Sequence, residues 1–63
     1  MKKIVNCYLN VRIGSPSVAA PCIEYLEPGM TVEVLDSVAG SMIDGNNTWY
    51  RDDADNYYWS GGF

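Results

Sequence analysis

The sequence predicts an all-β domain, either a small barrel or a pair of packed sheets, built from five to six short antiparallel strands. Three observations support this prediction. Short stretches alternate between apolar and polar residues, turn-forming residues separate these stretches, and no stretch carries the 3.6-residue apolar period of a helix. With 63 residues, the chain is long enough for one domain, which we assign to residues 1–63.

The first half of the chain predicts three strands. In the first, residues 5–12, alternation places Cys7, Leu9 and Val11 inward and Tyr8, Asn10 and Arg12 outward. A loop over 14–21 precedes a short strand over 22–26. Pro28-Gly29 has the residue types of a type II turn, because proline presets φ and glycine accepts a positive φ. Residues 30–36 then alternate most clearly, with Val32 and Val34 inward.

The second half predicts a long loop and two further strands. Residues 37–47 are rich in Gly, Asp and Asn, and we expect a loop there with Met42 and Ile43 folded onto the core. Strands follow over 48–51 and 57–59, joined by a hairpin connection at 52–56, and residues 60–62 turn the chain before Phe63.

Composition excludes several functions. Histidine is absent, so Ser–His and Cys–His nucleophile pairs and His-containing metal sites are impossible. The net charge of −4 repels phosphate backbones, so we expect no nucleic-acid partner. No stretch approaches the roughly 18 apolar residues of a membrane span, and we expect no membrane partner. We also expect no enzyme activity, no metal and no cofactor.

The N-terminal residues resemble the start of a signal peptide without completing one. Lys2 and Lys3 precede apolar residues, but the apolar run stops at Asn6 and no small-residue cleavage site follows. We expect the chain to be intracellular, or else a domain excised from a longer protein of the cell envelope or exterior. Cys7 and Cys22, with 14 residues between them, leave two alternatives open: a disulfide, or two partly buried free thiols.

The order of several short motifs resembles that of the bacterial SH3 domain (SH3b). From about residue 8 to residue 63 these motifs are Leu9-Asn10-Val11-Arg12, Gly14, Pro16-Ser17, Pro21-Cys22-Ile23, Leu26, Pro28-Gly29, Val32-Glu33-Val34-Leu35, Trp49-Tyr50-Arg51, Asn56-Tyr57-Tyr58 and Phe63. The chain departs from the family pattern by one extra residue in 14–17, by Cys22 in place of a common Val, and by Asn56 in place of a Gly. These departures lie mainly in loops, where ligand contacts usually occur.

The resemblance implies a small SH3-like β-barrel without catalytic machinery. Domains of this family commonly accompany cell-wall hydrolases and peptidases, and several kinds bind peptidoglycan peptides. The resemblance therefore implies a noncatalytic module for a short extended peptide, such as a peptidoglycan stem or crossbridge, with a hydrolase domain as a fused or separate partner.

The aromatic residues are the strongest functional signal. Eight aromatics in 63 residues are too many for so small a core to enclose. In the last strand, Tyr58 stands where the family has an inward Val, which turns Tyr57 and Trp59 outward. Exposed Tyr and Trp offer large, rigid contact areas, so we expect a ligand-binding site formed by Tyr8, Asn10, Tyr57 and Trp59, with Trp49 in the core. The alternative is that these rings only cap the ends of the barrel.

Two further interpretations concern the polar residues, and one alternative concerns the function. Arg12 and Asn10 could bind a peptide backbone or carboxylate, although pairing of Arg12 with a nearby carboxylate of the protein is the favoured interpretation. The acidic segment 52–56 lacks the EF-hand pattern and suits local hydrogen bonds better than calcium, but its charge could attract a cationic ligand. The alternative function is a protein–protein domain that packs on a catalytic partner or on a second copy.

Overall fold

The protein is all-β, as the sequence predicts. The computed structural model describes all residues 1–63 and contains seven strands and one turn of 3-10 helix, where the sequence predicts five to six strands. They are β1 (Lys2–Ile4), β2 (Leu9–Ile13), β3 (Cys22–Leu26), β4 (Thr31–Glu33), β5 (Asp36–Ile43), β6 (Asn46–Arg51), β7 (Asn56–Trp59) and η1 (Ser60–Gly62).

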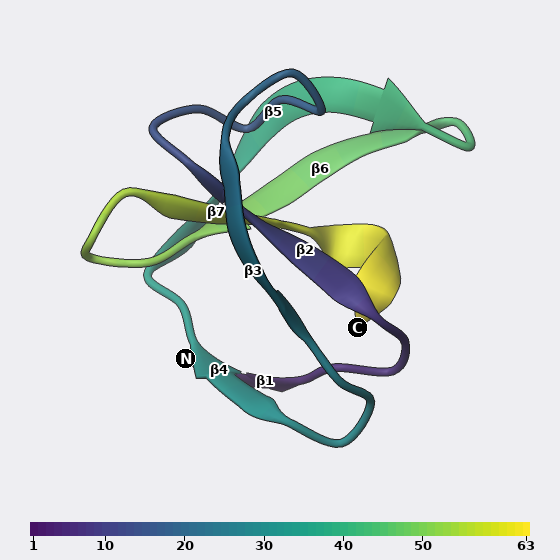
Figure 1. Cartoon of the computed structure of the whole chain (residues 1–63), viewed down its shortest axis with the longest axis vertical. Helices are drawn as coiled ribbons and strands as arrows, with labels where there is room; N and C mark the ends of the chain where they lie inside the picture. The colour runs from purple at the N-terminus through teal and green to yellow at the C-terminus, as the bar shows by residue number, and fades with distance from the viewer.

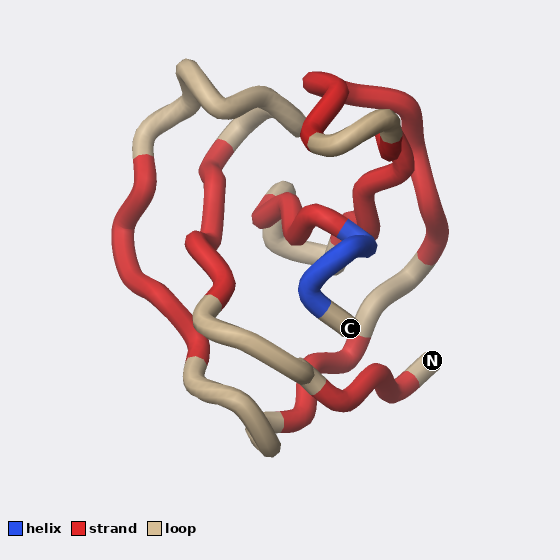
Figure 2. The backbone as a smooth tube through the Cα atoms, turned by 90° about the vertical axis from the view of Figure 1, so that its right-hand side faces the viewer, coloured by secondary structure: helices blue, strands red, loops and turns tan.

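The strands form two antiparallel sheets around one core. The larger sheet has the order β3-β2-β7-β6-β5, and the smaller pairs β1 with β4 (Figure 1). Backbone hydrogen bonds also fix the segments between the strands: Leu35 N–H donates to the Arg51 carbonyl of β6, and Asn6 N–H donates to the Gly62 carbonyl of η1. Figure 2 shows the strands running around the molecule with η1 in the middle of the view. The only helical segment, η1, has three residues, and the structure contains no helix that could cross a bilayer.

Seven buried side chains form the core, five from strands of the two sheets and two, Val5 and Val34, from the segments between strands. They are Val5, Leu9, Val11, Leu26, Val32, Val34 and Tyr58. The inward positions predicted at Leu9, Val11, Val32, Val34 and Tyr58 are therefore confirmed. Tyr50, Trp59 and Phe63 pack against this core while remaining partly exposed. Because β-strands alternate sides, the opposite face of the larger sheet carries the residues between these core positions.

The predicted loop over 37–47 is wrong. Residues 36–51 form the β5–β6 hairpin, in which Asp44 and Gly45 are the two connecting residues. Both have positive φ, 50° and 78°, as a type I′ hairpin turn requires. The small and polar residues of β5 are typical of a loop. They form a strand here because β-propensity depends on pairing and packing more than on the isolated residue. Met42, expected on the core, is 66% exposed.

Three smaller expectations are also corrected. Lys2–Ile4 form a strand that the sequence pattern does not predict. This strand has only three residues, and it forms by pairing with β4, which lies far away in the sequence. The strand predicted over 30–36 is interrupted: β4 ends at Glu33 and β5 starts at Asp36. Cys7, expected inward, is exposed because it lies in a bend before β2, where the alternation has not yet begun.

The predicted turns are confirmed. At Pro28-Gly29, glycine has a φ of +93° and Met30 N–H donates to the Glu27 carbonyl at 3.2 Å, as in a type II turn. Residues 52–55 connect β6 to β7, and η1 turns the chain before Phe63. The predicted loop over 14–21 separates β2 from β3.

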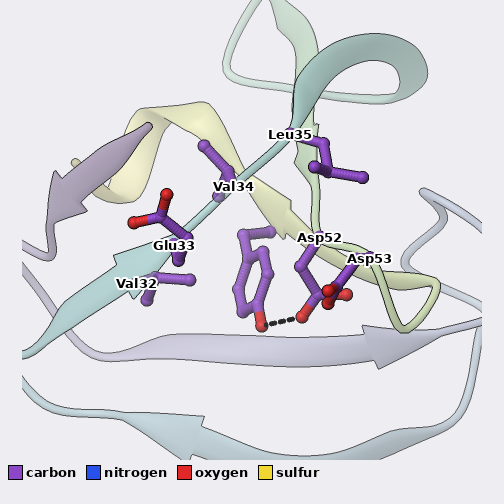
Figure 3. Close-up of a pocket in the computed structure, with 7 residues that line it drawn as sticks. Val32, Glu33, Val34, Leu35, Asp52 and Asp53 are labelled. Atoms are coloured by element: carbon purple, nitrogen blue, oxygen red, sulfur yellow. Dashed lines mark hydrogen bonds between the residues drawn. The ribbon is translucent and has the colours of Figure 1, made fainter.

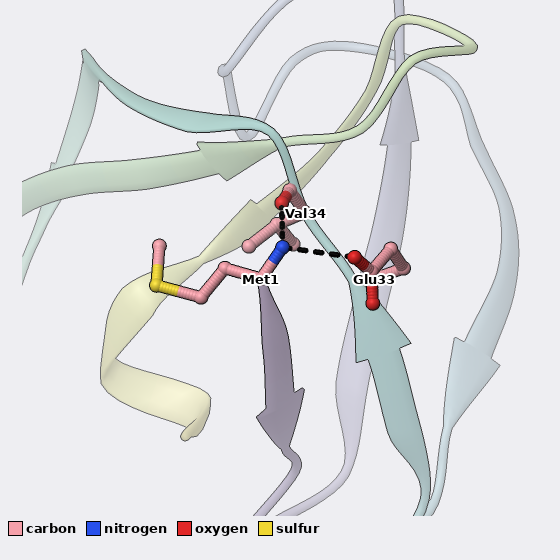
Figure 4. Close-up of polar contacts among 3 residues, drawn as sticks. All are labelled: Met1, Glu33 and Val34. Carbon is pink, nitrogen blue, oxygen red and sulfur yellow. Dashed lines mark hydrogen bonds and ion pairs between the residues drawn. The ribbon is translucent and has the colours of Figure 1, made fainter.

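The amino group of Met1 joins β1 to the end of β4. It donates hydrogen bonds to Glu33 Oε1 at 2.9 Å and to the Val34 carbonyl at 2.8 Å (Figure 4). The hydrogen bond from this amino group lowers the pKa of the Glu33 carboxyl below its ordinary value. Both partners are exposed, so the ion pair contributes little to stability.

Candidate functional site: an aromatic groove

The outer face of the larger sheet collects aromatic and polar side chains from neighbouring strands. Strand register places Tyr25 opposite Asn10, Tyr57 opposite Arg12 and Trp59 opposite Trp49. Directly paired residues of antiparallel strands project on the same side of a sheet. The groups therefore share the face of the sheet opposite Tyr58, and Trp59 also packs against the edge of the core.

A groove of about 140 Å³ lies on this face. We call it the aromatic groove; its lining residues are Tyr8, Leu9, Asn10, Arg12, Val18, Ile43, Trp49 and Trp59. Three of the four predicted ligand-binding residues, Tyr8, Asn10 and Trp59, are brought together here. The fourth, Tyr57, shares the outer face through its register with Arg12 but does not line the groove.

Trp49 lies at the base of the groove rather than in the main core. Its side chain is only 2% exposed, so the expectation of burial is confirmed, but it does not belong to the core cluster. The indole N–H donates to the Ser41 carbonyl at 2.9 Å. The loop 14–21 covers the ring near Pro16, and Gly40 permits this close approach because it has no Cβ. Trp49 is therefore buried on the outer face by a loop instead of by the second sheet.

Hydrogen bonds to its backbone hold the loop in place, and three of them involve Ser41 or Arg12. Ser41 Oγ accepts from Val18 N–H at 3.1 Å, and Ser41 N–H donates to the Pro16 carbonyl at 2.9 Å. Arg12 Nη1 donates to the Ala20 carbonyl at 3.1 Å. These contacts place Val18 on the wall of the groove.

Trp59 forms a half-buried wall at the other side. Its indole N–H donates to the Asn46 carbonyl at 3.0 Å, and Asn46 Nδ2 donates to Ser60 Oγ at 3.0 Å. The ring lies so close to Gly61 that a Cβ there would meet Cζ2 at 2.5 Å. The hydrogen bond to Asn46, which Ser60 in turn holds in place, and the contact with Gly61 therefore set the position of this ring.

Tyr8 and Asn10 are the exposed members of the groove. Tyr8 is 68% exposed, and its ring lies 6.0 Å from that of Tyr25, between centroids, in a tilted arrangement. The Asn10 amide makes no hydrogen bond within the protein, so its donors and acceptor are free for a ligand.

Arg12 has no carboxylate partner, contrary to the favoured interpretation of the sequence. The ion pairs of the structure join Met1 to Glu33 and Arg51 to Asp36, and neither includes Arg12. One nitrogen of its guanidinium binds the Ala20 carbonyl, while the side chain lines the groove. The Asp52 carboxylate of the acidic segment 52–56 is engaged elsewhere, by Ala54, Asn56 and the core residue Tyr58.

A second cavity, of about 340 Å³, lies on that side of the molecule (Figure 3). It is lined by Val32, Glu33, Val34, Leu35, Asp52, Asp53 and Tyr58. The Tyr58 hydroxyl donates to Asp52 Oδ2 at 2.8 Å, the dashed contact in Figure 3. Burial and this contact with a carboxylate raise the pKa of Tyr58 well above its ordinary value.

Asp52 uses its carboxylate to close the β6–β7 connection. Oδ1 accepts from Ala54 N–H and Asn56 N–H, each at 2.9 Å, and Oδ2 accepts from Asn56 Nδ2 at 3.1 Å in addition to Tyr58. Burial alone would raise the pKa of this carboxyl, but the four hydrogen bonds outweigh burial and hold the pKa below its ordinary value. The expectation of local hydrogen bonding in segment 52–56 is thus confirmed. No group of three or more acidic or thiol side chains is placed to hold a metal ion.

The two cysteines are exposed and unpaired. Cys7 precedes β2, and the Cys22 thiol at the start of β3 donates to the Glu24 carbonyl at 3.3 Å. Both therefore differ from the partly buried thiols of one sequence-based alternative, and they do not form the disulfide of the other.

Sequence reasoning did not place four residues in the groove: Leu9, Val18, Ile43 and Trp49. The signal that could have found two of them is Asp44-Gly45, the strongest short hairpin signature in the chain. That hairpin places Ile43 at the end of β5 and Trp49 on β6. Val18 depends on how the loop 14–21 folds back, which no local pattern predicts.

Chemically, the groove offers stacking surfaces and hydrogen bonds. Its side chains are aromatic, aliphatic, one amide and one guanidinium, with no carboxylate among them.

No protein family and no curated protein matches the sequence in a comparison.

Proposed function

We propose that this protein is a noncatalytic binding module that recognises a short extended peptide in the aromatic groove. The observation that supports this most directly is the convergence of Tyr8, Asn10 and Trp59 on a floor formed by Trp49. Aromatic faces provide apolar contact at low entropic cost, and a free amide can pair with a peptide group.

The size of the groove favours a peptide over a whole small molecule. Sites for compact small ligands usually enclose about 300–1,000 Å³. A groove of about 140 Å³ suits a single side chain, with the rest of an extended ligand lying across Tyr8 and Asn10. Such a small interface predicts weak binding, from about micromolar to millimolar Kd, which tethering to a larger enzyme would strengthen.

The resemblance to SH3b domains supports a bacterial cell-wall peptide as this ligand, either a peptidoglycan stem or a crossbridge. In that setting the module would target a fused or partner hydrolase or peptidase to the wall. Asn10 belongs to the matching stretch Leu9-Asn10-Val11-Arg12, whereas Tyr8 and Trp59 come from the reasoning about strand faces.

A pull-down with purified peptidoglycan tests this function. We expect peptidoglycan to retain wild type but not the double variant Tyr8→Ala/Asn10→Ala, because the variant lacks two side chains of the groove. Both side chains are exposed, so their removal leaves the core intact and the variant folded. Leu35→Ala, which removes another exposed apolar side chain outside the groove, is the matched control and should be retained like wild type. Equal retention of all three proteins would contradict the proposal.

A second candidate function is protein–protein association. Nine large apolar side chains are exposed, among them Ile23 and Tyr25 on the edge strand β3 and Met42 at the far end of β5. Exposed apolar surface on a strand edge can pair with a partner or a second copy. A light-scattering mass near 14 kDa, twice the 7.0 kDa of the chain, would favour this function, and a mass near 7.0 kDa would disfavour self-association.

A further inference from the structure

We propose that the groove selects a peptide that carries a carboxylate beside an apolar side chain, with Arg12 as the residue that binds the carboxylate. This inference rests on the proposed peptide-binding function and adds the chemical class of the ligand. It depends on the charge environment of Arg12.

Arg12 is the one basic side chain of this acidic protein that no acidic or aromatic group engages. Of the four basic residues, Arg51 pairs with Asp36 in two hydrogen bonds, and Lys3 lies over the Tyr50 ring, 5.1 Å from its centroid. Lys2 is opposite Glu33 in the β1–β4 pair and helps to lower the pKa of that carboxyl. Arg12 therefore brings to the groove a positive charge that has no ion-pair partner within the protein.

The local geometry leaves the guanidinium able to accept an anion. Only Nη1 is used, by the Ala20 carbonyl, so the other N–H groups are free. The Ala20 contact also holds the side chain against the groove, which reduces the rotamer freedom that binding would otherwise remove. Arginine recognises a carboxylate by two parallel hydrogen bonds, which makes the pairing directional.

Asn10 and Arg12 are spaced to contact two groups on the same side of one extended ligand. They are two residues apart on the same face of β2, so their Cα atoms are separated by about 7 Å. This is the repeat of an extended peptide, which would place a peptide group at Asn10 and a carboxylate at Arg12. The apolar side chain between them would enter the space bounded by Trp49, Trp59 and Ile43.

The net charge of −4 does not oppose this pairing at contact distance. None of the acidic side chains lines the groove, and at an ionic strength of about 0.1 M exposed charges are screened beyond about 10 Å. A direct, partly desolvated Arg–carboxylate contact is screened much less. We therefore expect the local charge of Arg12 to dominate binding.

Titration with two matched peptides tests the proposal: acetyl-Gly-Gly-Leu with a free C-terminal carboxylate, and the same peptide as its C-terminal amide. Both Trp residues line the groove, so their two indole N–H signals in an NMR spectrum report on its occupancy. We expect the acid to bind wild type about tenfold more tightly than the amide, which corresponds to about 1.4 kcal/mol.

Substitutions at two arginines separate the local effect from total charge. Arg12→Gln should bind acid and amide equally, whereas Arg12→Lys should retain part of the preference because it keeps the charge without the fork. Arg51→Gln changes the net charge by the same amount as Arg12→Gln, but its guanidinium already pairs with Asp36 away from the groove, so the tenfold preference should persist. Circular dichroism confirms that each variant is folded.

The possible outcomes distinguish the two proposals. If wild type binds acid and amide equally in the groove, peptide binding stands and the role of Arg12 is wrong. If neither peptide moves the two indole signals, the carboxylate inference fails and peptidoglycan retention decides the proposed function separately. If Arg51→Gln abolishes the preference as fully as Arg12→Gln, long-range charge and not the groove is responsible.

Discussion

At the scale of single residues, Gly40 is the position on which the shape of the groove depends most. It lies within β5, where glycine is ordinarily unfavourable, yet a Cβ there would meet Pro16 Cβ at 2.6 Å and Trp49 Cδ1 at 2.8 Å. The absence of a side chain therefore lets the loop 14–21 close over Trp49. The same loop carries Val18 to the wall of the groove.

Gly40→Ala should consequently destabilise the protein and disturb the groove together. We expect the free energy of unfolding to fall by about 1–3 kcal/mol, because neither the Pro16 backbone nor the buried indole can move away easily. Urea unfolding followed by tryptophan fluorescence measures this change. Ser37→Ala, at an exposed position of the same strand, should change stability by less than about 0.5 kcal/mol. Equal effects of the two substitutions would contradict the close packing described here.

The Asp52–Tyr58 hydrogen bond predicts how stability depends on pH. The folded state lowers the pKa of Asp52, so its contribution is complete above the unfolded value of about 3.9 and is lost as pH falls toward the lowered value. The folded state raises the pKa of Tyr58, so its contribution is complete below about pH 10 and is lost as pH rises further. Urea unfolding across the pH range should therefore show declining stability at both extremes.

Tyr58→Phe isolates the alkaline limb of that profile. The variant loses the hydrogen bond to Asp52, which should cost about 1 kcal/mol at neutral pH, and its stability should fall less steeply above about pH 10. If wild type and variant declined in parallel at high pH, the raised pKa of Tyr58 would not be the cause.

At the scale of elements, η1 and the β5–β6 hairpin cooperate to place Trp59. The hairpin supplies the Asn46 carbonyl that accepts from the indole, while Gly61 of η1 lies against the ring. The position of Trp59 therefore depends on Asn46, 13 residues earlier in the chain, and on its near neighbour Gly61.

Gly61→Ala tests this placement without touching the core. Its Cβ would lie 2.5 to 2.6 Å from Cζ2 and Cζ3 of Trp59, so the ring must shift and strain its bond to the Asn46 carbonyl. We expect a folded protein whose Trp59 indole N–H signal moves in the NMR spectrum. Its affinity for acetyl-Gly-Gly-Leu should fall about three- to tenfold, a loss of about 0.7–1.4 kcal/mol of binding free energy. Asp53→Ala, exposed and outside the groove, should leave both readouts unchanged. An unshifted indole signal in Gly61→Ala would refute the contact.

The sequence was informative about elements wherever a local rule applied. Alternation predicted the inward positions Val32 and Val34, and Pro28-Gly29 predicted its turn, because both depend on the backbone preferences of adjacent residues. The hairpin over 36–51 was missed because its strand β5 is made of small and polar residues whose pairing partner is decided by tertiary packing. The site was predictable in outline for the same reason: strand parity identified outward rings, but the loop that buries Trp49 on the outer face is a long-range effect.

At the scale of the whole molecule, two small sheets enclose one core and leave the aromatic groove outside it. The radius of gyration, 10.2 Å, agrees with about 10.6 Å for a compact 63-residue domain. The core draws on both sheets and on the segments that join them, while the groove uses the larger sheet, Tyr8 just before β2, and Val18 of the loop 14–21. Leu9 and Trp59 contribute to both the core and the groove, whereas Tyr8 is exposed and outside the core. Tyr8→Ala should therefore remain as stable as wild type to within about 0.5 kcal/mol.

The most direct test of the groove as the binding surface is a backbone and indole NMR titration with soluble peptides released from peptidoglycan. We predict saturable shifts of both indole N–H signals and of Tyr8 and Asn10, with no change at Val32–Leu35 around the second cavity. Shifts confined to that second cavity, or none at the two indoles at saturating peptide, would contradict the account.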